Sequence, residues 1–248
     1  MNIFLFTEDE IHKPIPFQDS RYSHLQKILH KKVGDSFEAG IINGKAGKAT
    51  ITSITSDNIY FSFAPESNGK LLYPVTMIIG FPRPIQLKRL LRDIASLGIS
   101  HLHLIATDLG EKSYLQSNMA NPKEISLMLK DGTIQAHSTH IPTVHIHTNL
   151  ESCLQNLKIQ EEILVSLDNI KATTSLNTFL LSKKNQGKDL HTKGVIASIG
   201  SERGWSNRER QLFINNGFTL CSMGQRVLRT ETAATTAIAI ILSQMGTL

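Results

Sequence analysis

The spacing of apolar residues divides the chain into two parts with different patterns. Up to about residue 70, short apolar runs alternate with polar positions, as is typical of β-strands. Asn43-Gly44 lies between two such runs and is the dipeptide most typical of a tight hairpin. One segment with helical spacing places four apolar side chains on a single face: Tyr22, Leu25, Ile28 and Leu29. Several short strands with one helix predict a small β-barrel.

A segment rich in Pro, Gly, Ser and Asn, residues 65–74, separates this part from the rest. After it, nearly continuous apolar runs alternate with amphipathic segments, such as the helix expected to end at Gly98. This alternation is typical of a mainly parallel sheet covered by helices on both faces. We therefore expect a barrel over residues 1–72 and an α/β domain over residues 73–248.

The last two helices have recognisable start signals. Ser206 and Glu209 have the spacing of a capping box, and Gly217 is expected to end that helix. The final helix has no charged side chain after Glu231, and Thr230 is its expected N-cap. Its apolar run of roughly 15 residues is shorter than the roughly 20 of a membrane span. We expect this helix to pack on the sheet and on a partner subunit, and we expect no membrane association.

Net charge and cysteine usage indicate the kind of partner and the cellular compartment to expect. A formal net charge of +5 over 248 residues fits a polyanionic partner such as RNA without requiring one. Cys153 and Cys221 are far apart and lack C-x-x-C spacing, which is typical of buried thiols in a reducing compartment. The N-terminus has no basic region followed by a long apolar run, so no secretory signal is expected. These features predict a cytoplasmic protein.

Two loops that follow predicted strands and precede predicted helices are candidate binding elements. They cover residues 199–205 and 222–230 and carry Gly200, Gly204 and Gly224. In open parallel sheets, ligands bind beyond the carboxyl ends of the strands, and helix N-termini attract anions and polar ligand edges. Neither loop has the G-x-G-x-x-G spacing of a dinucleotide site, and from spacing alone both could be ordinary turns.

The second loop and the helix after it carry a more specific signal. The stretch GQRVLRTETA, residues 224–233, resembles the G-x-R-V-L-R-x-E-T-A signature of bacterial 16S ribosomal RNA (uracil-N3) methyltransferases, which belong to the SPOUT, or trefoil-knot, superfamily. Residues 199–204 resemble a second signature of that family, L-L-I-G-P-E-G-G. Residues 24–30, followed by Gly34-Asp35, resemble a third, N-terminal signature. The resemblance covers nearly the whole chain.

This resemblance implies a fold, a cofactor and a reaction. It implies a PUA-like, RNA-binding β-barrel before a trefoil-knotted SPOUT domain, working as a homodimer. The implied reaction transfers a methyl group from S-adenosyl-L-methionine (SAM) to N3 of a uridine in 16S rRNA, presented as free rRNA or within the small ribosomal subunit. The residues that would bind SAM are Leu167, Ile199, Gly200, Glu202, Gly204, Ser222, Met223, Gly224, Val227, Leu228 and Thr230.

The resemblance also implies a reaction centre at Arg226, Arg229 and Glu231. N3 of uracil must lose its proton as the methyl arrives, and a nearby cation would stabilise the resulting anion. Arg226 and Arg229 are the candidates for that role or for contact with a phosphate. Without the resemblance, a surface salt bridge would be the first interpretation of either arginine. No residue stands out as the general base.

Departures from the family pattern gather outside the C-terminal signature. They are Ser201 and Arg203 in the glycine-rich loop, Ser96, Leu109, Ile134, Ser138 and His30. Most lie in the half that would contact RNA or enclose the pocket from outside. This motivates the hypothesis that SAM binding is kept while the RNA contacts or the target have changed. The alternatives are an RNA-binding homologue with lost or weakened activity and a SPOUT methyltransferase that acts on a different RNA nucleotide.

Histidines recur in two predicted strands as H-x-H pairs, His101 with His103 and His145 with His147. The period of two residues in a strand puts both rings of a pair on one face. Imidazole is a common metal ligand, but no Cys, Asp or Glu cluster stands nearby at ligand spacing. The sequence therefore predicts histidines that face solvent or RNA, and no metal site.

Overall fold

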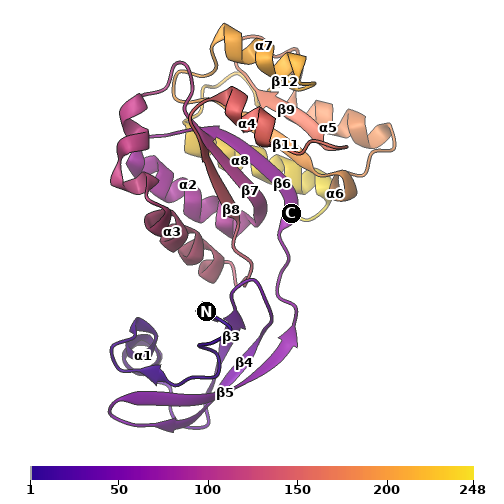
Figure 1. Ribbon diagram of the computed structural model, residues 1–248. Helices are drawn as coiled ribbons and strands as arrows, with labels where there is room; N and C mark the ends of the chain where they lie inside the picture. Colours follow the sequence, from indigo (N-terminus) through magenta and orange to yellow (C-terminus); the bar gives the residue numbers. More distant parts are fainter. Residues whose placement is uncertain (1) are drawn as a thin grey trace. The chain divides into compact units, whose positions relative to one another are not determined.

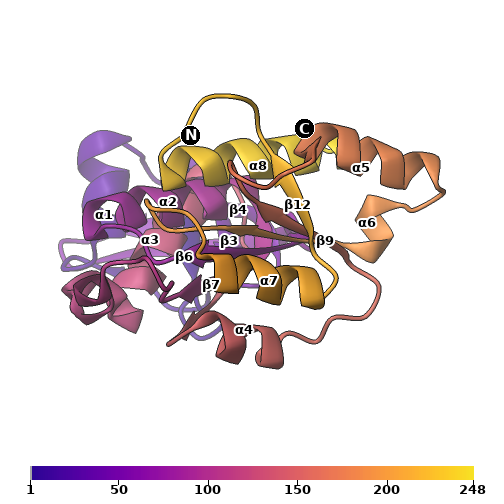
Figure 2. The same cartoon turned by 90° about the horizontal axis from the view of Figure 1, so that it is seen from above.

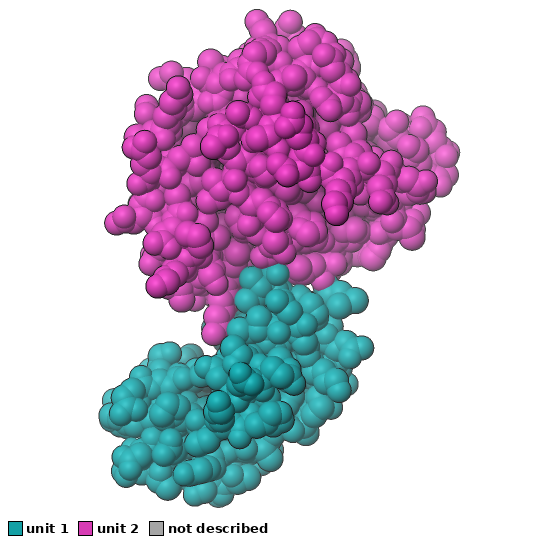
Figure 3. Space-filling model, viewed as in Figure 1, with its two compact units in different colours: residues 1–71, 133–141 teal, residues 72–132, 142–248 magenta. Residues whose placement is uncertain are grey.

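The computed structural model describes residues 2–248, without the side chain of Met119. The chain forms two compact units (Figure 3). Unit 1 contains the chain up to Leu71 together with Thr133–Ile141, and unit 2 contains Leu72–Gly132 and Pro142–Leu248. No local pattern in the sequence predicts the return of residues 133–141 to unit 1.

Unit 1 is built on a five-stranded sheet in the order β1-β3-β4-β5-β2. Its strands are β1 Phe4–Phe6, β2 Ile15–Pro16, β3 Ser36–Ile41, β4 Ala46–Ile54 and β5 Asn58–Ser67. The expected hairpin joins β3 to β4, where Asn43 has φ +58° and Gly44 N–H donates to Ile41 O (2.8 Å). The apolar side chains of this half-barrel enclose their own core, including Phe6, Phe37 and Ile59.

The predicted helix of unit 1 is shorter and less regular than expected. Helix α1, Ser20–Ser23, continues as a π-helical segment, η1, over His24–Ile28. Tyr22 and Leu25 are buried as predicted, but Ile28 is 68% exposed, so its placement on the buried face was wrong. A π-helical turn closes i→i+5 hydrogen bonds, which rotates successive side chains away from the positions of an α-helix.

Unit 2 contains a seven-stranded sheet in the order β10-β12-β9-β11-β6-β7-β8 (Figure 1). The strands are β6 Tyr73–Gly80, β7 Ile99–Ile105, β8 Thr143–His147, β9 Ile163–Leu167, β10 Thr174–Ser175, β11 Val195–Ile199 and β12 Thr219–Ser222. Every pairing between these strands is parallel. Central β11 is buried at all its positions, as its continuous apolar run predicts.

Helices cover both faces of this sheet, which confirms the predicted architecture. On one face lie α2 Pro84–Leu97, α5 Leu176–Asn185 and α8 Thr230–Met245, and on the other lie α4 Leu150–Asn156 and α7 Asn207–Asn215 (Figure 2). The remaining helical segments are η2 Lys112–Gln116, η3 Asn118–Ala120, α3 Pro122–Gln135 and α6 Leu190–Lys193. The trefoil knot implied by the resemblance stays a prediction. Across residues 2–248, no helix has the length and apolar character needed to cross a membrane.

The helix termini in unit 2 follow their sequence signals with one exception. Gly98 ends α2 in the left-handed conformation, and Ser206 with Glu209 forms the predicted capping box of α7. The N-cap of α8, however, is Arg229 and not Thr230. Arg229 has extended backbone angles, and its carbonyl accepts the first helical hydrogen bond, from Ala233 N–H (2.8 Å). Thr230 is therefore already the first helical residue.

Candidate functional site

A cavity of about 260 Å³ opens at the carboxyl ends of β9, β11 and β12. These three strands are neighbours in the sheet, so the loops that follow them meet at one edge. The lining residues are Leu167, Asp168, Asn169, Ile170, Ile199, Gly200, Ser201, Glu202, Arg203, Gly204, Trp205, Arg210, Met223, Arg226, Val227, Leu228, Thr230 and Ala233. The two loops singled out in the sequence thus lie against the same cavity as the beginning of α8.

Most of the residues expected at a cofactor site line this cavity. They are Leu167, Ile199, Gly200, Glu202, Gly204, Met223, Val227, Leu228 and Thr230, together with Arg226. Ser222, Gly224, Arg229 and Glu231 belong to the same segments but do not line it. Sequence reasoning missed the residues after β9, above all Asp168. An acidic residue directly after a buried strand was the available signal.

The glycine-rich loop after β11 makes a tight turn that only glycine can complete. Gly204 has φ +71°, and its N–H donates to Ser201 O (2.8 Å). A Cβ atom on Gly200 would lie 2.6 Å from the carbonyl carbon of Gly204. The departure at Arg203 leaves the turn intact, because this residue occupies an exposed turn position. The backbone of residues 200–204 can therefore approach a ligand closely.

A buried ion pair fixes the wall formed by the end of β9. Arg210 Nε donates to Asp168 Oδ2 (2.7 Å), and the two side chains are only 6% and 2% exposed. The other carboxylate oxygen, Oδ1, accepts from the N–H groups of Ile170 and Lys171 (2.8 and 2.5 Å). Trp205 Nε1 donates to Leu167 O (3.1 Å) and joins this wall to the glycine-rich loop. These bonds hold the cavity in one shape before any ligand arrives.

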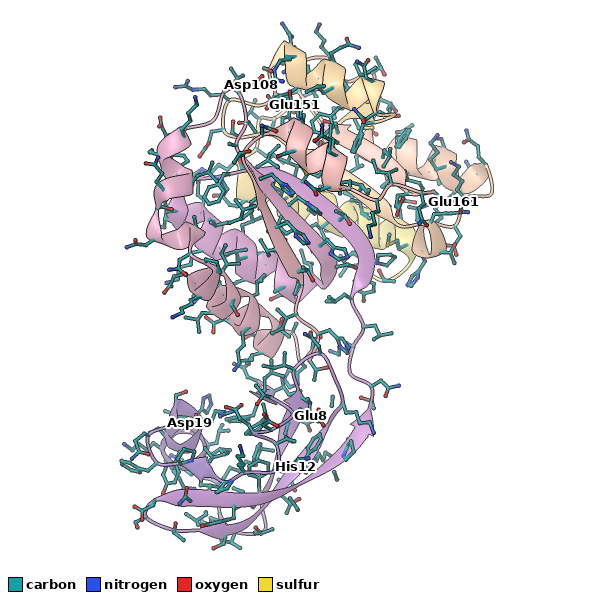
Figure 4. The ribbon with its side chains drawn as sticks, viewed as in Figure 1. Glu8, His12, Asp19, Asp108, Glu151 and Glu161 are labelled. Atoms are coloured by element: carbon teal, nitrogen blue, oxygen red, sulfur yellow. The ribbon has the colours of Figure 1, made fainter. Side chains whose placement is uncertain are left out.

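The loop after β7 is attached to the start of α7 by charged side chains. Buried Glu209 accepts hydrogen bonds from Asp108 N–H (2.9 Å) and Ser206 N–H (2.8 Å). Burial raises the pKa of Glu209, whereas the guanidinium of Arg208 lowers the pKa of Asp108. Arg208 also pairs with Glu151, which lies beside Asp108 in Figure 4. Asp108, directly before the departure at Leu109, therefore belongs to a structural network.

Two arginines, Arg226 and Arg229, lie exposed at the entry to α8. Within residues 2–248, the structure shows no ion pair or hydrogen bond for the side chain of Arg226 or Arg229. Among the residues that the structure describes, neither arginine forms the surface salt bridge considered for it. Thr230 and Glu231, directly after Arg229, are buried. Oε2 of Glu231 and Oγ of Ser201 are buried without a hydrogen-bond partner among the described residues. Ser201 lines the cavity, so its unsatisfied oxygen suits a site that is completed by a polar ligand.

A second cluster of polar side chains gathers on β7 and β8. Residues His103 and His145 are register partners, so the four histidines of these strands share one face of the sheet. His101 and His145 are exposed as expected, but His103 is only 7% exposed, so its predicted solvent exposure was wrong. Helix α4 covers this position and brings Cys153 beside it, which corrects the expectation that no cysteine lies nearby.

Both units match known protein families. Residues 70–242 match the RNA methyltransferase domain family, and residues 17–64 match the RNA methyltransferase PUA domain family. The chain is 38% identical over 253 residues to the ribosomal RNA small subunit methyltransferase E of Treponema pallidum, covering 98% of this chain and 91% of the relative.

Solved structures share the fold across both units. A ribosomal RNA small subunit methyltransferase E from Neisseria gonorrhoeae, bound to S-adenosyl methionine, aligns with TM-score 0.73 and 17% identity, covering 98% of this chain and 97% of that one. A Legionella pneumophila protein solved in complex with the cofactor SAM aligns with TM-score 0.76 and 19% identity, covering 98% and 97%. At identities of 17% and 19%, this structural similarity shows that the chain shares their fold.

Proposed function

Because the chain belongs to the ribosomal RNA small subunit methyltransferase E family, we propose that it methylates N3 of a uridine in 16S rRNA with SAM as the donor. The observation that carries this proposal is the meeting of three loops at one cavity, lined by both the glycine-rich turn and the C-terminal signature. The methyl donor would occupy this cavity, and the uridine would approach from the side of the exposed arginines.

The cavity has the features that SAM requires. Backbone groups of Gly200 and Gly204 can reach the adenosine part without interference from side chains, and Leu167, Ile199 and Leu228 provide apolar walls. The unpartnered Ser201 Oγ is available to a polar group of the cofactor. SAM supplies an activated methyl group on a sulfonium, so the protein needs only to hold both reactants in line.

The reaction replaces the N3–H bond of uracil with an N3–CH₃ bond. Bound SAM would supply the methyl carbon to the electron pair of N3, the N3 proton would pass to solvent water, and the carbon–sulfur bond would break to leave S-adenosylhomocysteine. Arg226 at the cavity and Arg229 at the N-cap of α8 are free to stabilise the negative charge that develops on the uracil. Glu231, buried in the first turn of α8, would orient this entry.

The RNA and the partner subunit would use other surfaces. The half-barrel of unit 1 would bind rRNA, in keeping with its PUA family match. Helix α8 presents an uncharged, only partly buried surface with α5, formed by Asn177, Thr235, Thr236, Ala239, Ile240 and Ser243. We propose that this surface forms a homodimer. We also propose a cytoplasmic location, in keeping with an rRNA substrate.

Mass spectrometry of reaction products tests the proposed function. The protein is incubated with SAM and either free 16S rRNA or small subunits from a strain that lacks the enzyme. We expect one new N3-methyluridine. A methyl group on another nucleotide would instead identify a methyltransferase with a different target. Calorimetric binding of SAM with no methylation of any RNA fraction would identify an RNA-binding homologue without activity.

A further inference from the structure

Three potential metal ligands from separate elements converge beneath helix α4. They are His103 on β7, His147 on β8 and Cys153 on α4. One ring nitrogen of each histidine and Sγ of Cys153 all lie within 4.8 Å of one another. Strand β8 is the edge strand next to β7 (Figure 1), so this group joins the edge of the sheet to a covering helix.

The two histidine rings are already positioned as a pair. Nδ1 of His103 lies 2.9 Å from Nε2 of His147, and the rings stack with centroids 5.1 Å apart at an interplanar angle of 14°. One of these nitrogens carries the shared proton and the other accepts it, so the two rings are not both imidazolium in this arrangement. Burial, reinforced by the neighbouring histidines, lowers the pKa of His103 to about 3, which keeps its ring neutral at physiological pH.

We propose that His103, His147 and Cys153 bind one Zn²⁺ ion, with water in the fourth position. Two imidazoles and a thiolate are a donor set that zinc prefers, and zinc has no geometric demand beyond a tetrahedron. In such a tetrahedron the ligand atoms lie about 3.3–3.6 Å apart. The imidazole nitrogens, at 2.9 Å, need to separate slightly, and the sulfur, which lies within 4.8 Å of a nitrogen of each ring, needs to close by no more than about 1.3 Å.

The required rearrangement is small and its protons are accounted for. His147 is only partly buried and belongs to the edge strand, so its ring can turn towards the sulfur. The shared proton moves to the opposite nitrogen of its ring, which frees both facing lone pairs for the metal. The thiol of Cys153 loses its proton to solvent as the sulfur–zinc bond forms. Burial raises the pKa of this thiol to about 12, so the metal must displace that proton.

The bound ion would link three elements of the fold. Cys153 is completely buried in the apolar cluster that packs α4 and α7 on the sheet, and His103 is buried beside it. A metal ion bonded to all three side chains would fix the edge strand and α4 to β7. Sequence spacing could not reveal this arrangement, because β7 and α4 are separated by about 45 residues and only the parallel pairing of β7 with β8 brings them together.

Metal binding by the full-length chain tests this proposal without SAM or RNA. Metal-free protein is titrated with Zn²⁺ against a chromophoric chelator, and with Co²⁺ as a spectroscopic probe. We expect one equivalent of zinc, a rise in melting temperature on binding, and both tetrahedral cobalt bands and a sulfur-to-cobalt charge-transfer band. Cys153→Ala and His147→Gln should each weaken zinc binding at least about tenfold and remove the charge-transfer band.

Matched controls separate this site from other thiols and histidines. Cys221→Ala removes a cysteine that is also buried, and His101→Gln removes an exposed histidine on the same face, so both should retain full zinc binding. Circular dichroism establishes that each variant is folded. His147→Gln alters a partly buried edge position and keeps the test decisive should Cys153→Ala fail to fold. Wild-type protein without a sulfur-to-cobalt band, or equal zinc binding in His147→Gln, would overturn the proposal.

Discussion

At the scale of single residues, the glycine that the site cannot lose is Gly200. We predict that Gly200→Ala weakens SAM binding at least about tenfold, because its Cβ would push against the backbone of Gly204. Calorimetry measures the affinity. Gly34→Ala is the control, since Gly34 belongs to unit 1 and has open space where a Cβ would stand. The same loss of SAM affinity in both variants would contradict a local steric cause.

Gly224, by contrast, does not line the cavity and has open space where a Cβ would stand, although its φ is +107°. A larger residue there would strain the backbone and would not fill the cavity. Both glycines belong to the two loops that the sequence indicates as candidate binding elements. The structure distinguishes them: Gly200 is required because the backbone of Gly204 lies close to it, and Gly224 is required because its φ is positive.

The exposed arginines separate binding from chemistry. We predict that Arg229→Ala lowers turnover by about 100-fold while the affinity for SAM changes little, because the lost charge acts on the uracil anion. Single-turnover kinetics with saturating rRNA and calorimetry with SAM measure the two quantities. Arg92→Ala, which removes an arginine already paired with Asp131, serves as the control. Undiminished turnover in Arg229→Ala would exclude a role in the reaction.

At the scale of elements, local signals predicted helix ends well where a side chain makes the cap. The capping box of α7 is one such case, and it also holds the loop after β7. We predict that Glu209→Gln lowers the free energy of unfolding by about 1–3 kcal/mol, because the amide NH₂ must face one of two backbone donors. Urea denaturation measures the change. No loss of stability in this variant would show that the two hydrogen bonds contribute little.

The ion pair beside this cap depends on pH with a defined sign. Arg208 lowers the folded-state pKa of Asp108, so its stabilisation is complete above the unfolded pKa and is lost as the pH falls through the folded one. We predict that Arg208→Gln is less stable than wild type by less than about 1 kcal/mol near pH 7, since the pair is partly exposed. This difference should shrink below about pH 4. Denaturation across pH measures it, and a constant difference would contradict it.

At the scale of the whole molecule, the parallel sheet and its helical layers could be predicted from apolar periodicity alone. The contacts between side chains of distant segments could not. Asp168 with Arg210, and His103 with Cys153, meet only because strands distant in sequence are neighbours in the sheet. The same limit applies to residues 133–141, whose return to unit 1 has no local signature. Most cavity residues were predicted because the recognised motifs themselves lie in the loops that line it.

Dimer formation is a further property of the whole molecule, and it can be tested at the surface of α8. We predict that Ile240→Glu converts a dimer into monomers, because the surface of α8 around Ile240 is uncharged and only partly buried in one chain. A carboxylate enclosed between two copies would lose its hydration without gaining a cation. Ile214→Glu on α7 is the control, since that isoleucine is 47% exposed and lies outside the α8 surface. Light scattering after size-exclusion chromatography measures the mass. A monomeric wild type, or a dimeric Ile240→Glu, would place the association surface elsewhere or exclude it.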